Sequence, residues 1–292
     1  LIFEVSTITR YNSMERTGSS PYLFSSPRCK YQRGEVTGNP RDKDGIIRGA
    51  TFDLDGTIIG PNEEISPQVH RAVTELASLV PVFIATGREP EDVIRFARQL
   101  GLTTPQVSDG GAAILDPISG EAVWTAALGE ADAEEIVRML DRMGSAFVAT
   151  HANGTARRLD EIIDWDIVRV SALDLSHSAA DALAHEFSGN PDVDAVRAKL
   201  PYNGLWAVDF TRSGVDKSTG ISQVGESIGV KAADMAAAGD SFNDLPMLLS
   251  SGLSIAMGNA PEQVKAAAHF VAPPVEEDGL AFAIREYIIP RV

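Results

Sequence analysis

Short apolar segments alternate with amphipathic helical segments through two stretches of the sequence. In the first, an apolar segment ending at Phe52 precedes a helical pattern from Pro67, and Pro81–Ala85 precedes a second helical pattern from Pro90. In the second stretch, residues 217–287, helical and apolar segments alternate again. Such alternation is typical of a parallel sheet with crossover helices on both faces. We therefore predict an α/β fold with a doubly wound parallel-sheet core.

The segment between these stretches has a different pattern. Short strand-like segments surround Asn153-Gly154, a dipeptide typical of tight hairpin turns, and a helical segment lies on each side. Hairpins pair strands in antiparallel fashion, so we expect a separate α+β cap domain inserted into the core. The predicted division is a core domain of residues 46–127 and 204–292 and an inserted cap of residues 128–203.

Residues 1–45 differ from the rest of the chain. They show no sustained hydrophobic period and are dense in Ser, Thr, Gly and Pro. Segments of this composition bury too little apolar surface to fold on their own. We expect an unstructured N-terminal extension.

Composition excludes several classes of function. The net charge of -16 disfavours nucleic acid as a partner, because phosphate backbones are met by clustered Lys and Arg. No apolar segment approaches the ~20 residues of a membrane span, so no membrane association is expected. With Cys29 as the single cysteine, the chain has no internal disulfide and no cysteine-based metal site, which favours a cytoplasmic location. Oligomeric state is not predicted.

Polar motifs follow three of the predicted strands. Asp53-Leu54-Asp55-Gly56-Thr57 follows the first strand, Thr86-Gly87-Arg88 the second, and Gly239-Asp240-Ser241-Phe242-Asn243-Asp244 the strand that ends at Ala238. Open α/β sheets bind ligands at the carboxyl ends of their strands, so these motifs should converge in one crevice.

The convergence predicts a magnesium site. Asp53 and Asp55 are two residues apart beside Gly56, and Asp240 and Asp244 add acid from another strand. Carboxylates this close repel one another unless a cation lies between them, and oxygen ligands favour Mg²⁺. Any one of these aspartates taken alone is more often a helix cap. Their joint occurrence at strand ends favours the metal site.

The motifs resemble those of a known superfamily. DLDGT at Asp53–Thr57, ATGR at Ala85–Arg88, Lys217 within VDKSTG, and GDSFNDLPML at Gly239–Leu248 resemble the four motifs of the haloacid dehalogenase (HAD) superfamily of phosphatases. Their order and spacing are similar to its Cof-like branch, which carries a large αβ cap between the second and third motifs. The resemblance extends over about residues 46–288. It implies a HAD-like Rossmannoid core.

The resemblance also implies catalytic roles. Asp53 would attack phosphorus and become an aspartyl-phosphate, and Asp55 would protonate the leaving group and then activate water. Thr86, Gly87, Lys217 and Asn243 would bind the phosphoryl group. Mg²⁺ would be held by Asp53, by the backbone carbonyl of Asp55 and by Asp240, with Asp244 holding its waters or the Lys217 ammonium.

The expected function is a Mg²⁺-dependent phosphatase acting on a small phosphorylated metabolite, such as a sugar phosphate. The alternatives are a phosphosugar mutase of the same superfamily, and a catalytically inactive phosphate-binding or receiver-type signalling domain. Two positions stand apart from the motifs. Gly110 replaces the Asn of the Cof-like pattern, and no role is assigned to it. Arg88 is interpreted as a surface ion-pair residue outside the site.

Overall fold

The computed structural model describes residues 46–152, 154–200 and 203–292. The extension predicted for residues 1–45 and Asn153 of the predicted hairpin turn lie outside these described residues. Within them, no helix combines the length and the apolar character needed to cross a membrane.

A five-stranded parallel sheet forms the core. Its strands run in the order β13-β12-β11-β1-β2, and every neighbouring pair is parallel. The strands are β1 (Gly49–Phe52), β2 (Val82–Ile84), β11 (Met235–Gly239), β12 (Leu253–Ala256) and β13 (Phe270–Val271). The parallel sheet predicted from the alternating pattern is therefore confirmed.

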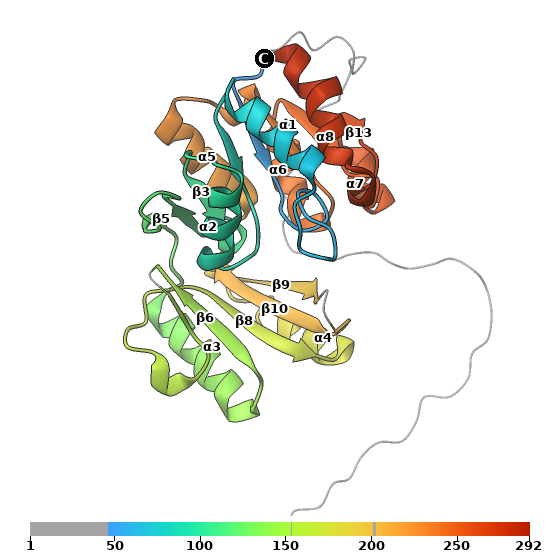
Figure 1. Cartoon of the computed structure of the whole chain (residues 1–292). Coiled ribbons are helices and arrows are strands. Elements are labelled where there is room, and N and C mark those ends of the chain that lie inside the picture. Colours follow the sequence, from blue (N-terminus) through green and yellow to red (C-terminus); the bar gives the residue numbers. More distant parts are fainter. Residues whose placement is uncertain (1–45, 153, 201–202) are drawn as a thin grey trace, which may run out of the picture. The chain divides into compact units, whose positions relative to one another are not determined.

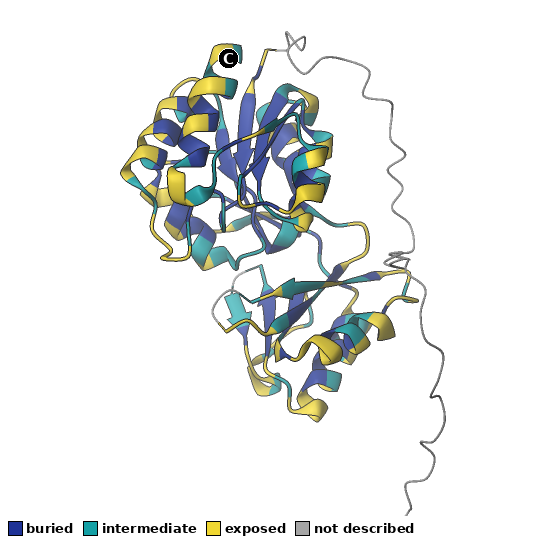
Figure 2. Ribbon diagram, turned by 90° about the vertical axis from the view of Figure 1, so that its right-hand side faces the viewer, coloured by how far each residue is buried: buried dark blue, intermediate teal, exposed yellow. Residues whose placement is uncertain are grey.

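Helices cover both faces of this sheet. The helices of one face are α1 (Pro67–Ala77), α2 (Pro90–Gln99) and α8 (Gly279–Ala283), and those of the other are α5 (Lys217–Ile228), α6 (Leu245–Ser250) and α7 (Glu262–Ala267). Successive strand residues point to opposite faces, so Ile84 packs in the cluster with α1 while Phe83 packs with α5. Figure 2 shows the strands buried between helices whose outer sides are exposed. This is the doubly wound arrangement.

Helix α5 has a fixed starting point. The side chain of Asp216 accepts hydrogen bonds from the backbone N–H groups of Ser218 and Thr219, which an N-cap residue does at a helix start. Gly229 ends the helix with a left-handed φ of 70°. The cap at Asp216 places Lys217 in the first turn of α5, where that turn faces the sheet.

A second sheet is antiparallel and carries its own core. Its order is β7-β6-β8-β10-β9, and α3 (Glu130–Met143) and α4 (His177–Glu186) pack on one face (Figure 1). The strands are β6 (Phe147–His151), β7 (Gly154–Ala156), β8 (Ile167–Leu175), β9 (Val193–Lys199) and β10 (Trp206–Arg212). The face packed by these helices is apolar and includes Phe147, Val170, Val208 and Phe210.

The position of β10 differs from the sequence prediction. Residues 204–292 were assigned to the core domain, but Trp206–Arg212 is hydrogen-bonded to β8 and β9 and to no strand of the parallel sheet. The sequence of β10 shows an apolar strand without showing its partners. We propose that the inserted segment extends to Arg212, and we call residues 128–212 the inserted unit.

A small sheet connects the core to the inserted unit. It contains β3 (Gln106–Ser108), β4 (Ala113–Leu115) and β5 (Ala122–Thr125), all antiparallel, and Val107 bridges to Ala85 at the end of β2. Between β3 and β4, Gly110 and Gly111 have φ of 69° and 111°. Such a left-handed backbone suits Gly or Asn, which accounts for Gly at the position where the Cof-like pattern has Asn.

Gly111 also allows close contact with α5. A Cβ atom at Gly111 would lie 1.9 Å from the backbone oxygen of Asp216, whereas a Cβ at Gly110 would meet nothing within 4 Å. The start of α5, and with it Lys217, therefore depends on the missing side chain at Gly111.

We predict that Gly111→Ala destabilises the protein much more than Gly110→Ala does. Both changes place Ala at positive φ, which costs about 1–2 kcal/mol, but only Gly111→Ala adds a backbone clash, which costs a further 1–3 kcal/mol or so. Urea unfolding followed by circular dichroism measures both variants. Equal unfolding free energies for the two would contradict this reading of the contact.

Candidate active site

The three polar motifs meet at the carboxyl edge of the parallel sheet. Asp53 follows β1, Thr86 follows β2, and Asp240 with Asp244 follows β11, and β1 lies between β11 and β2. The backbone N–H of Asp53 donates to the carbonyl of Ala238 at 2.9 Å, which ties the first motif to the last. The predicted convergence of strand ends is present in the structure.

Lys217 lies buried between two of these carboxylates. Its Nζ is 2.5 Å from Oδ1 of Asp53 and 2.5 Å from Oδ1 of Asp244. The lysine is 1% exposed, and Asp53 and Asp244 are also buried. A buried ammonium needs such partners, because removing it from water without them costs several kcal/mol. Position 217 is thus not the solvated helix-start lysine that its sequence context alone would suggest.

Burial and mutual repulsion control the ionisation of this group. Burial, then the neighbouring Asp244, raises the pKa of Asp53 well above its usual value, although Lys217 opposes the shift. Burial works against the charged form of Lys217, but the carboxylates of Asp244 and Asp53 more than offset it and raise the lysine pKa. The ammonium therefore stays charged, and it is a single positive charge among several acids.

Asp240 forms the other side of the group. Its Oδ2 accepts from Nδ2 of Asn259 at 2.9 Å, and the same amide donates to the carbonyl of Gly56 at 3.0 Å. Burial, followed by repulsion from Asp244, raises the pKa of Asp240 to about 7. Gly56 has φ of 77°, and a Cβ there would lie 2.2 Å from Asp240 Oδ2, so the first motif needs glycine at this point.

The acids fit a divalent cation. One carboxylate oxygen from each of Asp53, Asp240 and Asp244 lies within 4.8 Å of the others. Oxygen donors of this kind suit a hard cation such as Mg²⁺. After burial, repulsion from Asp244 is the next cause that raises the pKa of Asp53 and of Asp240, and a cation between these carboxylates would offset it. The side chain of Asp55 is outside this set.

The carboxylate of Asp55 is instead held by Arg88. The guanidinium donates Nε to Oδ2 at 2.9 Å and Nη2 to Oδ1 at 2.7 Å, a two-point contact of fixed geometry. Arg88 also contacts Glu63 and Asp92. The sequence interpretation placed Arg88 outside the site, and the structure places it against one of the two acids of the first motif. Near Arg88 in the sequence, the only feature that pointed to the site was its position two residues after Thr86.

The predicted phosphate-binding residues other than Lys217 follow β2 and β11. Thr86 is buried, and its Oγ1 accepts a hydrogen bond from the backbone N–H of Arg88 at 3.2 Å, so its own proton is available to another acceptor. Gly87 follows it in the same loop. Asn243 is exposed and precedes Asp244 in the turn Phe242–Asp244. Asp244 Oδ2 accepts from the N–H groups of Asp240 and Ser241, which fixes that turn.

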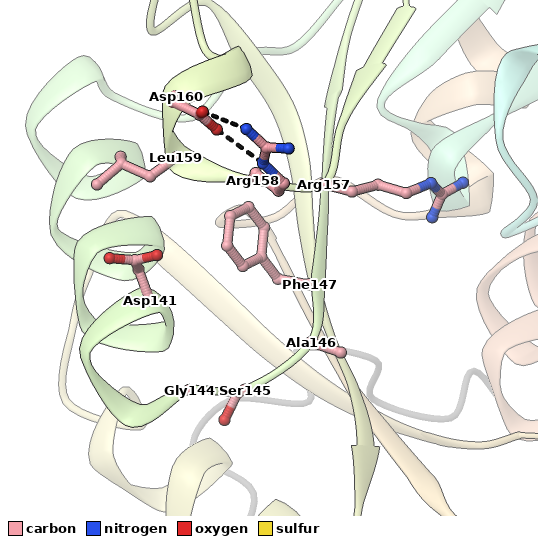
Figure 3. Close-up of a pocket in the computed structure, with 9 residues that line it drawn as sticks. All are labelled: Asp141, Gly144, Ser145, Ala146, Phe147, Arg157, Arg158, Leu159 and Asp160. Atoms are coloured by element: carbon pink, nitrogen blue, oxygen red, sulfur yellow. Dashed lines mark hydrogen bonds and ion pairs between the residues drawn. The ribbon is translucent and has the colours of Figure 1, made fainter.

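A separate hollow of about 620 Å³ lies within the inserted unit (Figure 3). Its arginines already have acidic partners: Arg158 pairs with Asp160, and Arg157 points away and reaches Glu89 at 3.2 Å. The hollow contains none of the motif residues. We therefore place the chemistry at the strand ends.

Comparisons with known proteins identify the family. Residues 50–161 and 159–284 match the family model described as haloacid dehalogenase-like hydrolase. The chain is 25% identical over 250 residues to 5-amino-6-(5-phospho-D-ribitylamino)uracil phosphatase YcsE of Bacillus subtilis, covering 85% of this chain and 98% of the relative. It is also 25% identical over 233 residues to the phosphoglycolate phosphatase of Methanococcoides burtonii, covering 77% and 89% respectively.

A solved structure shows the same fold. The crystal structure of a haloacid dehalogenase-like hydrolase from Bacteroides thetaiotaomicron superimposes with a TM-score of 0.72 at 20% identity. The match covers 82% of this chain and 98% of that one.

We predict that the contribution of Asp240 to the stability of the metal-free protein falls as pH rises. An acid whose pKa is raised to about 7 on folding holds its proton in the folded state after the unfolded chain has lost it. The folded state then binds more protons, so the stability contributed by Asp240 falls between about pH 4 and about pH 7. The measurement is urea unfolding in chelator for the wild type and Asp240→Asn, whose difference isolates this residue. A difference that is flat, or that rises with pH, would refute the assignment.

Proposed function

The chain belongs to the haloacid dehalogenase-like hydrolases, and from that premise we propose that it is a Mg²⁺-dependent phosphatase of a small phosphorylated metabolite. The observation that carries the proposal is the buried contact of Asp53 with Lys217, beside the carboxylates of Asp240 and Asp244. A nucleophilic carboxylate, a fixed cation and a set of metal ligands are what phosphoryl transfer to aspartate requires.

In the proposed reaction, an oxygen of the Asp53 carboxylate attacks phosphorus in line. The new bond joins that oxygen to phosphorus, and the bond from phosphorus to the ester oxygen of the metabolite breaks. Lys217, which contacts Oδ1 of Asp53 at 2.5 Å, orients the carboxylate and offsets the charge that builds up on the phosphoryl group.

Asp55 would act first as the general acid and then as the general base. It donates a proton to the departing oxygen, then takes one from the water that attacks the aspartyl-phosphate, and inorganic phosphate leaves with Asp53 regenerated. Both oxygens of Asp55 accept hydrogen bonds from Arg88 in this structure, and each oxygen keeps a second lone pair that can carry the proton. We propose that Arg88 aims the Asp55 carboxyl group between turnovers.

The phosphoryl oxygens would be bound by the loop after β2 and the turn after β11. The Thr86 hydroxyl, the Gly87 N–H and the Asn243 amide are the proposed donors, together with Lys217. Mg²⁺ would be held by Asp53, Asp240 and the backbone carbonyl of Asp55, with Asp244 fixing Lys217. When bound, the ion would supply the positive charge that this acidic group lacks.

The proposed substrates are sugar or polyol phosphates. The relative from Bacillus subtilis is named for a phosphorylated ribityl compound, which is a polyol phosphate. The proposal of a cytoplasmic location rests on Cys29 being the single cysteine. Phosphate release from a panel of sugar phosphates, polyol phosphates, phosphoglycolate and nucleotides would test the substrate class.

We predict that Asp53→Asn lowers phosphate release from an aryl phosphate by at least about a thousandfold, because the amide cannot attack phosphorus. Asp166→Asn, a change of the same type at an exposed position, should stay within about twofold of wild type. Circular dichroism checks that both variants fold. If Asp53→Asn keeps a tenth of the wild-type rate, Asp53 is not the nucleophile. With a sugar phosphate as the substrate, phosphate that stays esterified to sugar would indicate a mutase.

We predict that chelation abolishes activity and that Mg²⁺ restores it, with Ca²⁺ a poor replacement. Ca²⁺ takes more ligands at longer distances than Mg²⁺ and would misplace the reacting groups. The test is phosphate release after exhaustive chelation and after addition of each ion. Thermal unfolding with each ion, measured alongside, separates binding from catalysis. Undiminished turnover in chelator would exclude the metal-dependent mechanism.

A further inference from the structure

A buried ion pair joins the inserted unit to the core beside the proposed phosphate-binding loop. Arg169 lies in β8, and its Nη2 is 3.0 Å from Oδ1 of Asp109, the residue that follows β3. The side chain of Arg169 is 9% exposed and that of Asp109 is fully buried. Arg169 belongs to the sheet of the inserted unit, and Asp109 to the turn between β3 and β4.

Arg169 also reaches the loop after β2. Its Nη1 donates a hydrogen bond to the carbonyl oxygen of Gly87. The two neighbouring carbonyls are held as well, because the N–H of Gly110 donates to Thr86 at 3.0 Å and the N–H of Asp109 donates to Arg88 at 3.1 Å. All three carbonyls of this loop are therefore fixed, and the middle one depends on a side chain of the inserted unit.

Fixing the Gly87 carbonyl has a direct consequence for Thr86. The carbonyl and N–H of one trans peptide point in opposite directions, so the bond from Arg169 to Gly87 also aims the N–H of Arg88. That N–H donates to Oγ1 of Thr86 at 3.2 Å. With the oxygen accepting from Arg88, the hydroxyl proton of Thr86 is left for another acceptor.

The pair is poorly arranged for stability alone. Asp109 has φ of 51°, which is costly for a residue other than glycine. Within the described part of the chain, the buried Nε of Arg169 has no hydrogen-bond partner. Buried charges with incomplete hydrogen bonding are often less favourable than apolar packing of the same volume. A function other than stability would account for keeping this arginine.

We propose that Arg169 is a positioning residue, which holds the peptide between Gly87 and Arg88 so that the Thr86 hydroxyl donates to the phosphoryl group. Because Arg169 belongs to the inserted unit, the phosphate-binding loop has its donor geometry only when β8 is seated on the core. This inference rests on the proposed phosphatase function, since it assigns a role within the same site.

The test measures binding of inorganic phosphate by calorimetry in the presence of Mg²⁺, together with kcat and KM for an aryl phosphate. Arg169→Met should weaken phosphate binding about tenfold or more, the effect of losing one well-placed donor. Arg169→Lys keeps the charge opposite Asp109 but has no fork to reach both partners, so it should bind phosphate with intermediate affinity. Arg169→Lys is also the variant to measure if Arg169→Met does not fold.

Two controls separate positioning from a general effect on folding. Arg157→Met removes the exposed contact of another arginine of the inserted unit with Glu89 and should change phosphate binding less than about twofold. Thr86→Val removes the hydroxyl that Arg169 is proposed to aim. In that background, adding Arg169→Met should weaken phosphate binding little further, because the two changes disable the same donor.

The outcomes are distinct. If Arg169→Met weakens phosphate binding equally with and without the Thr86 hydroxyl, or if both Arg169 variants bind phosphate as the wild type does, the positioning role is wrong while the phosphatase proposal stands. If the wild type neither binds phosphate nor hydrolyses the aryl phosphate, the proposed function fails and the inference fails with it.

Discussion

One buried ammonium group holds the acidic site together. Lys217 contacts Asp53 from the end of β1 and Asp244 from the turn after β11, so it links two neighbouring strands of the sheet across their carboxyl ends. Its own position is set by the helix cap at Asp216 and by the close passage of Gly111. The backbone of the β3–β4 turn thus helps to set the position of the Lys217 ammonium. Without Lys217, the buried carboxylates of Asp53 and Asp244 would lose the ammonium that pairs with both, at a cost of several kcal/mol.

The parts of the molecule that sequence could predict are those encoded locally. An apolar strand followed by acids and a glycine specifies both a buried β1 and the position of Asp53 at its end, since parallel strands present their carboxyl ends at one edge. The start of α5 is equally local, because Asp216 caps the helix from one residue away. The roles of the site residues stay predictions. The structure places Lys217 in contact with Asp53 and Asp244, and it groups the carboxylates of Asp53, Asp240 and Asp244.

The features that sequence could not predict depend on partners far away in the chain. In the sequence Arg88 resembles any exposed arginine, and only the fold shows that it contacts Asp55 at the end of β1. Strand β8 contains Arg169, and the carboxylate that pairs with this arginine is that of Asp109, in the turn between β3 and β4. Strand β10 has an evident strand pattern, but only its pairing with β8 and β9 shows which sheet it joins. Periodicity describes the faces of an element and does not identify its neighbours.

The inserted unit returns to the core by a very short path. Strand β10 ends at Arg212, and α5 begins at Lys217, so its last strand leads almost directly into the helix that carries the neutralising lysine. Recombination that exchanged this unit for another would have to deliver the chain to Asp216 in the same direction, and would have to replace the hydrogen bond that Arg169 gives to Gly87. Units inserted at this point are therefore not freely interchangeable on this core. A graft that matches the fold but not these two junctions would keep the motif residues of the core in the sequence. It would lose the arrangement of their side chains.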